Sequence, residues 1–468
     1  MKDKRPNILF IMSDDHASHA MSCYGSKVNQ TPNLDRISNG GMRFDNCFCT
    51  NSICTPSRAT ILSGTYNHIN NVTTLGSKMD NRLQTFPKLL QSNGYQTAIV
   101  GKWHLGQGPE HEPTGFDFWR VLPGQGLYHD PVMIDADGKQ VFAGYVTDLI
   151  TDMSLEWLRN RDKEQPFCLL CHHKAPHRHW EPDEKHARMY DDIDIPEPET
   201  FNDDYSNRAS AAAAAEMRIE RDLNARDLKV PIPEGLTKAQ EKSWRYQRYI
   251  KDYLRVIASI DDNVGRLLDY LYAEGLSENT LVIYTSDQGF FLGDHGWFDK
   301  RFMYEESLRM PFIVRFPREI KAGTVNEDII LNTDFAPLFL DLAGVEKPED
   351  FQGRSIRPLL NGQTPEDWRQ SMYYRYWMHK AHHNVYAHYG IRTHKHKLIY
   401  YYSDALGQPG TIDETYEPEW ELFDLEKDPC ELNSVYNDPA YSNVVAHLTK
   451  ELHRLQSEVG DARYEKDV

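Results

Sequence analysis

Residues 7–16 read NILFIMSDDH, an apolar run that ends abruptly in a polar cluster. Three later stretches have the same form: residues 97–104 (TAIVGKWH), 167–177 (FCLLCHHKAPH) and 281–289 (LVIYTSDQG). Continuous apolar runs of this length are typical of strands covered on both faces, as in a parallel sheet.

Helical patterns fall between these runs. The clearest covers residues 247–272, where apolar side chains recur with a period of 3.6 residues until Gly275 offers a stop. Alternation of strands and helices predicts a doubly wound α/β domain with a mostly parallel sheet. Ligands of such sheets bind beyond the carboxyl ends of the strands, where all four polar clusters are expected.

Two further regions differ from the rest of the chain in amino-acid composition. Residues 183–227 are acidic and Pro-containing and include an alanine run, which predicts an exposed insertion, either a lid or oligomer contact or, as we favour, a solvated helix. Residues 371–468 are rich in aromatic and histidine side chains and end in an amphipathic helical pattern. We therefore expect a catalytic α/β domain over residues 1–370 and a smaller C-terminal α+β subdomain with a short antiparallel sheet over residues 371–468.

Charge and composition exclude several classes of function. The chain has 468 residues, 52 basic and 70 acidic, with a net charge of −18, which disfavours nucleic acid and anionic membranes as partners. No apolar run reaches the roughly 20 residues that span a bilayer. Residues 1–6 lead into the first strand without a signal-peptide core, so we expect a cytoplasmic protein, or a periplasmic or secreted one whose leader has been removed.

Carboxylates gather at two predicted strand ends. Asp14 and Asp15 follow the first run, and Asp287 and Gln288 follow a later one. Adjacent carboxylates repel each other unless a cation neutralises them, although a helix N-cap would also explain the first pair. Three carboxylates and an amide oxygen are hard ligands, which predicts Ca²⁺, or alternatively Mg²⁺, rather than zinc.

Residues 54–64 (CTPSRATILSG) place Cys54 before a probable helix N-terminus, with Arg58 close by. A helix N-terminus and a nearby cation lower the pKa of a thiol and favour anions. The alternative is a structural cysteine in a helix-initiating loop.

The Cys-x-Pro-Ser-Arg stretch resembles the signature of type I sulfatases, members of the alkaline phosphatase superfamily. Further blocks similar to that family follow in the family's order: residues 7–15, 31–35, 101–106, 175–177, 286–303 and 421–429. Ser63 replaces a threonine common in the signature, and Gln288 takes a position often held by Asn or His.

The resemblance implies a formylglycine nucleophile, made from Cys54 by a separate maturation enzyme. One oxygen of the hydrated aldehyde attacks sulfur, and the second hydroxyl later collapses to expel sulfate. By the same resemblance a formylglycine oxygen at Cys54 completes a calcium site whose other ligands are Asp14, Asp15, Asp287 and Gln288.

Five basic residues match family positions around the sulfate. Arg58 would brace the nucleophile, His104 would act as the base of the elimination, and His177 would protonate the leaving oxygen. Lys102 and Lys300 would bind sulfate oxygens. Candidate sugar contacts are Asp294, His295, Arg375, Trp377, His379 and Arg392, although a His-rich surface loop would equally explain the C-terminal ones.

The resemblance therefore implies hydrolysis of an O-sulfate ester, with a sulfated carbohydrate as the expected substrate and a homo-oligomer as a possible assembly. Two alternatives stay open. A phosphonate or phosphate diester hydrolase would use the same nucleophile, and a binding protein would result if Cys54 were never matured.

Overall fold

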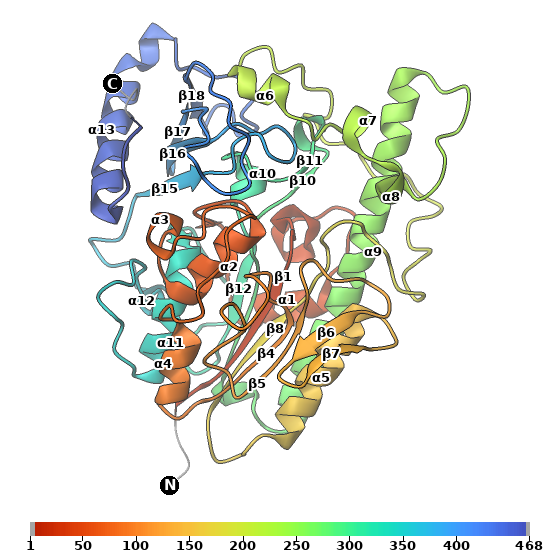
Figure 1. Ribbon diagram of the computed structural model, residues 1–468, viewed down its shortest axis with the longest axis vertical. Coiled ribbons are helices and arrows are strands. Elements are labelled where there is room, and N and C mark those ends of the chain that lie inside the picture. The colour runs from red at the N-terminus through yellow and green to blue at the C-terminus, as the bar shows by residue number, and fades with distance from the viewer. Residues whose placement is uncertain (1–4, 465–468) are drawn as a thin grey trace.

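A ten-stranded mixed sheet forms the centre of the protein in a computed structural model that describes residues 5–464 (Figure 1). The strand order is β13-β2-β12-β9-β1-β8-β4-β5-β6-β7. The strands are β1 (Asn7–Ser13), β2 (Met42–Phe44), β4 (Gln96–Lys102), β5 (Phe118–Leu122), β6 (Val132–Asp135), β7 (Gly138–Val141), β8 (Phe167–His172), β9 (Thr280–Ser286), β12 (Phe312–Arg315) and β13 (Thr324–Asn326). The prediction about a leader segment rests partly on residues 1–4, which lie outside the described residues.

The central strands β9, β1, β8, β4 and β5 run parallel, which confirms the predicted doubly wound α/β class. Antiparallel pairs flank them, β12 with β9 on one side and β6 with β5 on the other. In β1, Met12 lies opposite His172 and Ser13 opposite Ser286. The polar residues that follow each of these strands therefore meet at one edge of the sheet.

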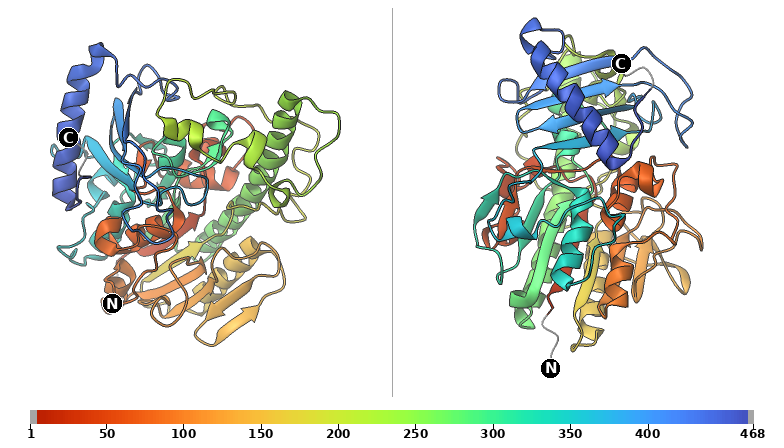
Figure 2. Two further views of the ribbon diagram at one scale, coloured as in Figure 1. Left: turned by 45° about the horizontal axis from the view of Figure 1, so that its top comes forward. Right: turned by 90° about the vertical axis from the view of Figure 1, so that its left-hand side faces the viewer.

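Helices cover both faces of the sheet (Figures 1 and 2). One layer contains α1 (Pro32–Asn39), α5 (Val146–Asn160) and α9 (Lys238–Ala273), and the other contains α2 (Cys54–Ser63), α4 (Phe86–Ser92) and α11 (Phe335–Ala343). Helix α9 begins earlier than the predicted residue 247, because a capping box between Thr237 and Gln240 starts it at Lys238. It ends before Gly275, whose φ is +67°.

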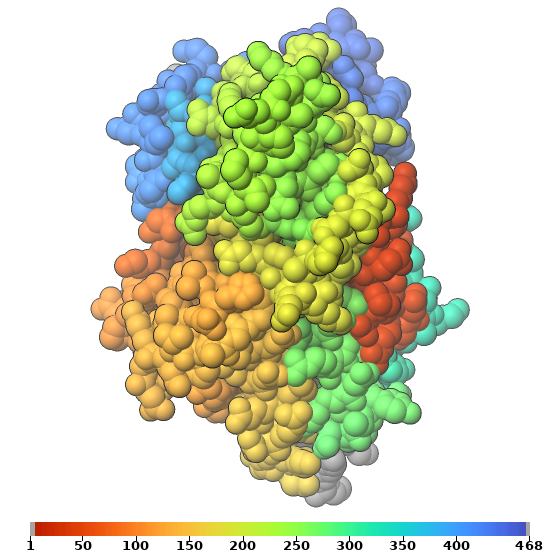
Figure 3. Space-filling model, turned by 90° about the vertical axis from the view of Figure 1, so that its right-hand side faces the viewer, coloured from red at the N-terminus to blue at the C-terminus, as the bar shows by residue number. Residues whose placement is uncertain are grey.

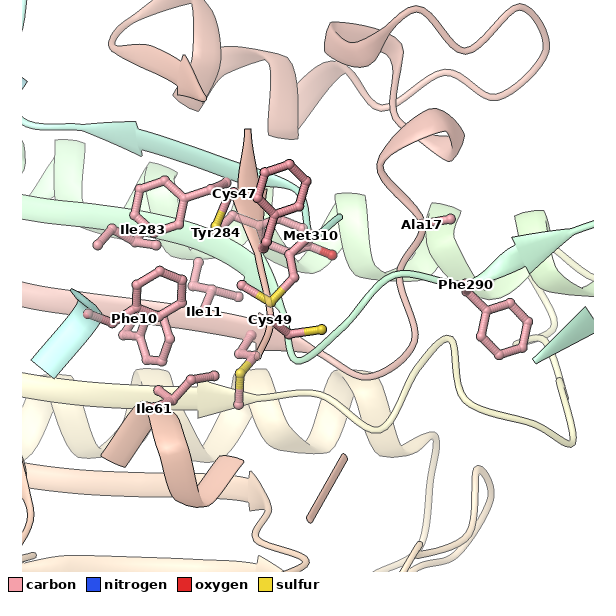
Figure 4. Close-up of a cluster of buried hydrophobic side chains, with 14 of the residues drawn as sticks. Phe10, Ile11, Ala17, Cys47, Cys49, Ile61, Ile283, Tyr284, Phe290 and Met310 are labelled. Carbon is pink, nitrogen blue, oxygen red and sulfur yellow. The ribbon is translucent and has the colours of Figure 1, made fainter. Parts of the chain in front are cut away.

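The apolar strand runs form the core. Phe10 of β1 lies beside Ile61 of α2 and Ile283 of β9 in one cluster, and all three side chains are fully buried (Figure 4). At about 25 cal/mol per Å² of apolar surface removed from water, burial of such side chains is the main favourable contribution to folding. Among the described residues no helix is both long and apolar enough to cross a membrane.

The C-terminal subdomain is a four-stranded antiparallel sheet in the order β15-β16-β17-β18, with α13 (Ser442–Val459) packed on one face. Its strands are β15 (Ser371–Tyr376), β16 (His388–Thr393), β17 (His396–Tyr401) and β18 (Glu419–Asp424). Leu448 and Leu452 of α13 are buried in a cluster with Tyr389 of β16. The predicted small antiparallel sheet with a helix is confirmed.

The predicted exposed insertion, residues 183–227, combines exposed stretches with side chains that pack against the rest of the protein. Its alanine run forms α6 (Ser210–Ala214), in which Ala211 and Ala212 are fully buried while Ser210 and Ala213 are exposed, so this helix is solvated on one side only. The segment continues through α7 (Ile219–Asp222) and α8 (Ala225–Leu228), both against α9. In Figure 3 its yellow-green surface lies against the blue C-terminal subdomain. Alanine favours a helix, and because its side chain is small, it also lets the helix pack closely against neighbouring segments.

Shorter elements complete the described chain. They are β3 (Cys47–Phe48), β10 (Phe291–Leu292), β11 (Phe298–Asp299), β14 (Ile330–Leu331), α3 (Asn67–Asn70), α10 (Glu305–Leu308) and α12 (Arg357–Leu360).

Candidate active site

An acidic cluster lies at the carboxyl edge of the sheet. Asp14 and Asp15 follow β1 and Asp287 follows the neighbouring β9, and one oxygen from each lies within 4.8 Å of the others. All three side chains are fully buried. Burial raises the pKa of Asp15 to about 6, which shows how much this group lacks solvation.

Several oxygens of this cluster lack a hydrogen-bond partner among the described residues. Oδ1 of Asp14 and Oε1 of Gln288 are buried in this state, while Oδ2 of Asp14 pairs with Lys102 and the amide nitrogen of Gln288 donates to Asp15. A buried acceptor without a donor is costly, so these oxygens fit a bound cation that takes hard ligands.

Cys54 is the first residue of α2, whose ten residues are all buried. Ile53 before it is extended, which turns the chain into the helix at the edge of the acidic cluster. Burial raises the pKa of the Cys54 thiol to about 11, so the expectation of a lowered thiol pKa is wrong. Loss of solvent outweighs the nearby cations, because the thiolate is enclosed on all sides.

Arg58 joins α2 to two strand ends. Its Nε donates to Oδ2 of Asp287 across 2.9 Å, and its Nη1 donates to the carbonyl of Lys102 across 3.0 Å. Ser57, beside it on the helix, donates to the carbonyl of Asp287. The helix that carries Cys54 is therefore fixed to β9 and β4 by charged and neutral hydrogen bonds.

Two lysines enter the cluster from different elements. Nζ of Lys300 lies 2.6 and 2.7 Å from the two carboxylate oxygens of Asp15. Lys102, the last residue of β4, contacts Asp14 and donates to Gln125. Both lysines are almost fully buried. Burial lowers the pKa of Lys102 well below its usual range. The charge of Lys300 also acts on Cys54, and buried positive charges of this kind suit an anionic ligand.

Hydrogen bonds to backbone carbonyl groups fix the positions of His104 and His177. His104 has a φ of +56°, and its carbonyl accepts from the Thr55 hydroxyl across 2.9 Å. Nδ1 of His177 lies 2.6 Å from the carbonyl of Arg178, which fixes the proton on Nδ1 and leaves Nε2 free, 3.8 Å from Oδ2 of Asp15. Burial, and then the charge of Lys102, holds the pKa of both imidazoles well below the usual range.

A cavity of about 400 Å³ opens beside the first turn of α2. Its lining includes Thr55 and His104, and the rest comes from residues 75–78, 106–107 and Gly124. The opening gives a ligand access to the first turn of α2.

Three of the predicted sugar contacts are committed to the interior. Asp294 pairs with His19 across 3.3 Å, His295 is fully buried with Nδ1 2.8 Å from Asp203, and Arg392 donates to Glu305 across 3.2 Å. Each of the three already has a partner within the chain, while Nε2 of His295 and Nη1 of Arg392 have no hydrogen-bond partner among the described residues, so all three stay predictions.

The other predicted sugar contacts lie at or behind a second opening. Arg375 and Trp377 line a cavity of about 510 Å³, where Arg375 lies 3.6 Å from the centroid of the Trp377 ring and donates to Asp461 across 2.9 Å. His379 is fully buried, and its Nδ1 accepts from the backbone of Ala387 across 3.1 Å. Arg375, Trp377 and His379 stay predictions.

Sequence reasoning did not identify two polar residues of the site. Gln125 accepts the hydrogen bond of Lys102. Lys174 is buried over the Tyr128 ring, 4.5 Å from its centroid, and its charge lowers the pKa of His177 after burial, Lys102 and Lys300. Lys174 stands three residues before His177 in a polar strand end, a signal that would have made it a candidate.

The fold and the site together are those of a hydrolase of anionic esters: a mostly parallel α/β sheet whose carboxyl edge combines a buried acidic cluster, a helix N-terminus and buried lysines. Two family models match the chain, "Sulfatase" over residues 6–345 and "N-sulphoglucosamine sulphohydrolase, C-terminal" over residues 293–458. The chain belongs to the sulfatase family of the alkaline phosphatase superfamily and is a sulfuric ester hydrolase.

Individual relatives agree with this assignment. An N-acetylglucosamine-6-O-sulfatase of Bacteroides thetaiotaomicron is 46% identical over 98% of this chain and 87% of its own length. The human N-acetylglucosamine-6-sulfatase is 28% identical over 80% of this chain and 67% of its own. A solved structure in complex with its substrate, D-glucosamine-2-N,6-O-disulfate, superposes with a TM-score of 0.91 at 44% identity and covers 99% of both chains.

Proposed function

We propose that the protein removes the 6-O-sulfate of an N-substituted glucosamine. The observation that carries the proposal is the cluster of Asp14, Asp15 and Asp287 with Cys54 and two buried lysines, which suits a sulfate ester. The choice of sugar is supported by the relative at 46% identity, which is named for that activity, and by the disulfated glucosamine bound to the similar structure.

Two groups would complete the site. The unpartnered Oδ1 of Asp14 and Oε1 of Gln288, with Asp15 and Asp287, fit Ca²⁺, with Mg²⁺ as the alternative. Cys54 would be converted to formylglycine by a maturation enzyme, in keeping with a thiol that burial holds protonated at neutral pH. When present, the aldehyde hydrate supplies the nucleophilic oxygen and the cation lowers the pKa of that oxygen.

The chain's own residues would bind the sulfate and move protons. Lys102 and Lys300 place positive charge where sulfate oxygens gain negative charge. Arg58 fixes the helix that carries the nucleophile. His104 lies beside Thr55, where it would take a proton from the nucleophile during sulfate release. Nε2 of His177 is free to carry a proton to the leaving sugar oxygen, and a bound sulfate anion would favour that protonated form.

A comparison of substrates tests the proposal. The matured enzyme would be assayed on N-acetylglucosamine 6-sulfate, on the 3-O-sulfated isomer, on 4-nitrophenyl sulfate and on an aryl phosphonate ester. We expect the highest kcat/KM on the 6-sulfate and loss of all turnover in Cys54→Ala. A preference for the phosphonate ester would favour the diester hydrolase instead, and equal rates on both isomers would contradict the 6-O assignment.

A further inference from the structure

The loop of residues 380–384, between β15 and β16, has a backbone that side chains rarely adopt. His382, His383 and Asn384 follow one another with φ of +53°, +62° and +52°, and Lys380 has +58°. Left-handed residues usually occur singly, so a run of three in residues with side chains persists only where the surroundings impose it.

Contacts on both sides of His382 impose this conformation. The backbone N–H of Glu216 donates to the carbonyl of His383 across 2.7 Å, and Nδ2 of Asn384 donates to the carbonyl of Ala214 across 2.9 Å. These partners belong to the segment 183–227, which packs against this loop. Lys380, on the other side, donates its N–H to the carbonyl of Val385 across 2.8 Å.

The loop is also tied to the catalytic edge. Nε2 of His383 lies 3.2 Å from Oδ2 of Asp299, and the same carboxylate accepts the backbone N–H of Lys300 across 2.9 Å. Lys300 in turn holds Asp15. The Asp299 carboxylate therefore connects His383 to Lys300, which is expected to bind the sulfate.

His382 differs from both of its neighbours. It is exposed, and its imidazole makes no hydrogen bond or ion pair to the part of the chain that the structure describes. Partial burial, and then the charge of Arg301, lowers the pKa of His382, with a further contribution from Lys300. In its neutral form the imidazole offers one donor and one acceptor nitrogen, and the residue directly follows Ala381 and precedes His383, which pairs with Asp299 beside Lys300.

We propose that His382 is a specificity-determining residue that hydrogen-bonds a hydroxyl or amide group of the sugar whose sulfate is held at Lys300. The segment 183–227 and Asp299 position it by fixing its neighbours in the left-handed conformation. This inference rests on the proposed carbohydrate substrate.

Two variants and a control distinguish the effect of the imidazole from that of the backbone conformation. His382→Gly removes the side chain and accepts a positive φ, while His382→Asn also accepts that φ but retains a donor and an acceptor. We expect kcat/KM on N-acetylglucosamine 6-sulfate to fall roughly 10–100-fold in His382→Gly, mainly through KM, and to recover in part in His382→Asn. The fall should be at least about tenfold larger than on 4-nitrophenyl sulfate. His394→Ala, an exposed histidine of the same subdomain, is the matched control and should match wild type on both substrates.

The outcomes are distinct. Wild-type kcat/KM on the sugar in His382→Gly would overturn the inference and leave the proposed function intact. Equal losses on both substrates would also overturn it, because they would assign the loop a structural part. If the wild-type enzyme fails to hydrolyse the sulfated glucosamine, both proposals fall.

Discussion

Nε of Arg58 donates to Oδ2 of Asp287 across 2.9 Å, and both side chains are at most 2% exposed. This bond connects the helix that carries Cys54 to the acidic cluster. One side chain thereby couples the position of Cys54 to that of the acidic cluster.

Removal of this arginine should damage both stability and metal binding. In Arg58→Ala the Asp287 carboxylate stays buried without its cation, which should cost about 3–5 kcal/mol of unfolding free energy. Arg58→Lys keeps the charge but not both hydrogen bonds, so we expect an intermediate loss. Chemical unfolding and metal analysis of the two variants check this. Wild-type stability in Arg58→Ala would contradict it.

Asp14 should contribute strongly to cation affinity, because its buried Oδ1 has no hydrogen-bond donor among the described residues. Purified protein should hold about one divalent ion per chain. Asp14→Asn should weaken binding by more than the roughly 10–100-fold typical of outer-shell substitutions. Calorimetric titration of chelated protein with Ca²⁺ and Mg²⁺ measures this. Asp269→Asn, on an exposed carboxylate, is the control, and unchanged Ca²⁺ affinity in Asp14→Asn would refute the site.

Cys54 should carry an aldehyde after coexpression with a formylglycine-generating enzyme. Mass spectrometry of the hydrazide-reactive peptide that contains Thr55 to Arg58 detects the conversion. Cys54→Ser should accumulate a sulfated enzyme, because a plain ester lacks the second hydroxyl that expels sulfate. Cys23→Ala serves as the control for a cysteine outside the site. Multiple turnover by Cys54→Ala would exclude this nucleophile.

His177 should matter most when the leaving group is poor. A sugar hydroxyl needs a proton to depart, whereas nitrophenolate leaves without one, so the defect of His177→Ala should be roughly 10²–10⁴-fold on the sugar and much smaller on the aryl ester. Steady-state kinetics on both substrates measure the difference. Defects of equal size would assign His177 to sulfate binding instead.

Stability should fall as pH rises through neutrality, in part because of Glu421. Burial raises the pKa of this carboxyl from 4.5 to about 7, although Ala209 and Tyr401 donate to it across 2.7 and 2.9 Å. The folded state therefore binds a proton that the unfolded state releases between these values, so stability present below pH 4.5 is lost as pH rises to about 7. That loss amounts to roughly 3 kcal/mol.

Glu421→Gln removes this titration and keeps an acceptor for Ala209. Its unfolding free energy, measured in denaturant from pH 5 to pH 8, should decline less than that of wild type by up to about 3 kcal/mol. Parallel profiles of the two proteins would show that Glu421 does not titrate in this range.

The sheet and its catalytic edge were predictable because a few local signals determine them. A strand buried on both faces must be apolar, so residues 7–12 and 281–284 identified the central strands. Parallel strands bring their carboxyl ends together, which placed Asp14 beside Asp287 without knowledge of the strand order.

Other properties depend on partners far along the chain. Arg392 and His295 looked available for a sugar, but Glu305 and Asp203 engage them in the fold. The thiol pKa of Cys54 depends on complete enclosure, which no local pattern reveals. His382 was one of six histidines in a biased stretch, and only the backbone and the anchored neighbours distinguish it.

The parallel pairing of β1 with β9 also has a consequence for the time during biosynthesis at which the structure around Cys54 can form. The hydrogen bonds that hold α2, and with it Cys54, in place include those to Asp287 after β9, and about 230 residues must leave the ribosome between Cys54 and the end of β9. At roughly 5–20 residues per second, this takes on the order of 10–50 s. A modifying enzyme that needs Cys54 in an extended chain must act within that interval. Slower translation upstream of β9 would lengthen the interval, and chaperones that delay the closure of the sheet would do the same.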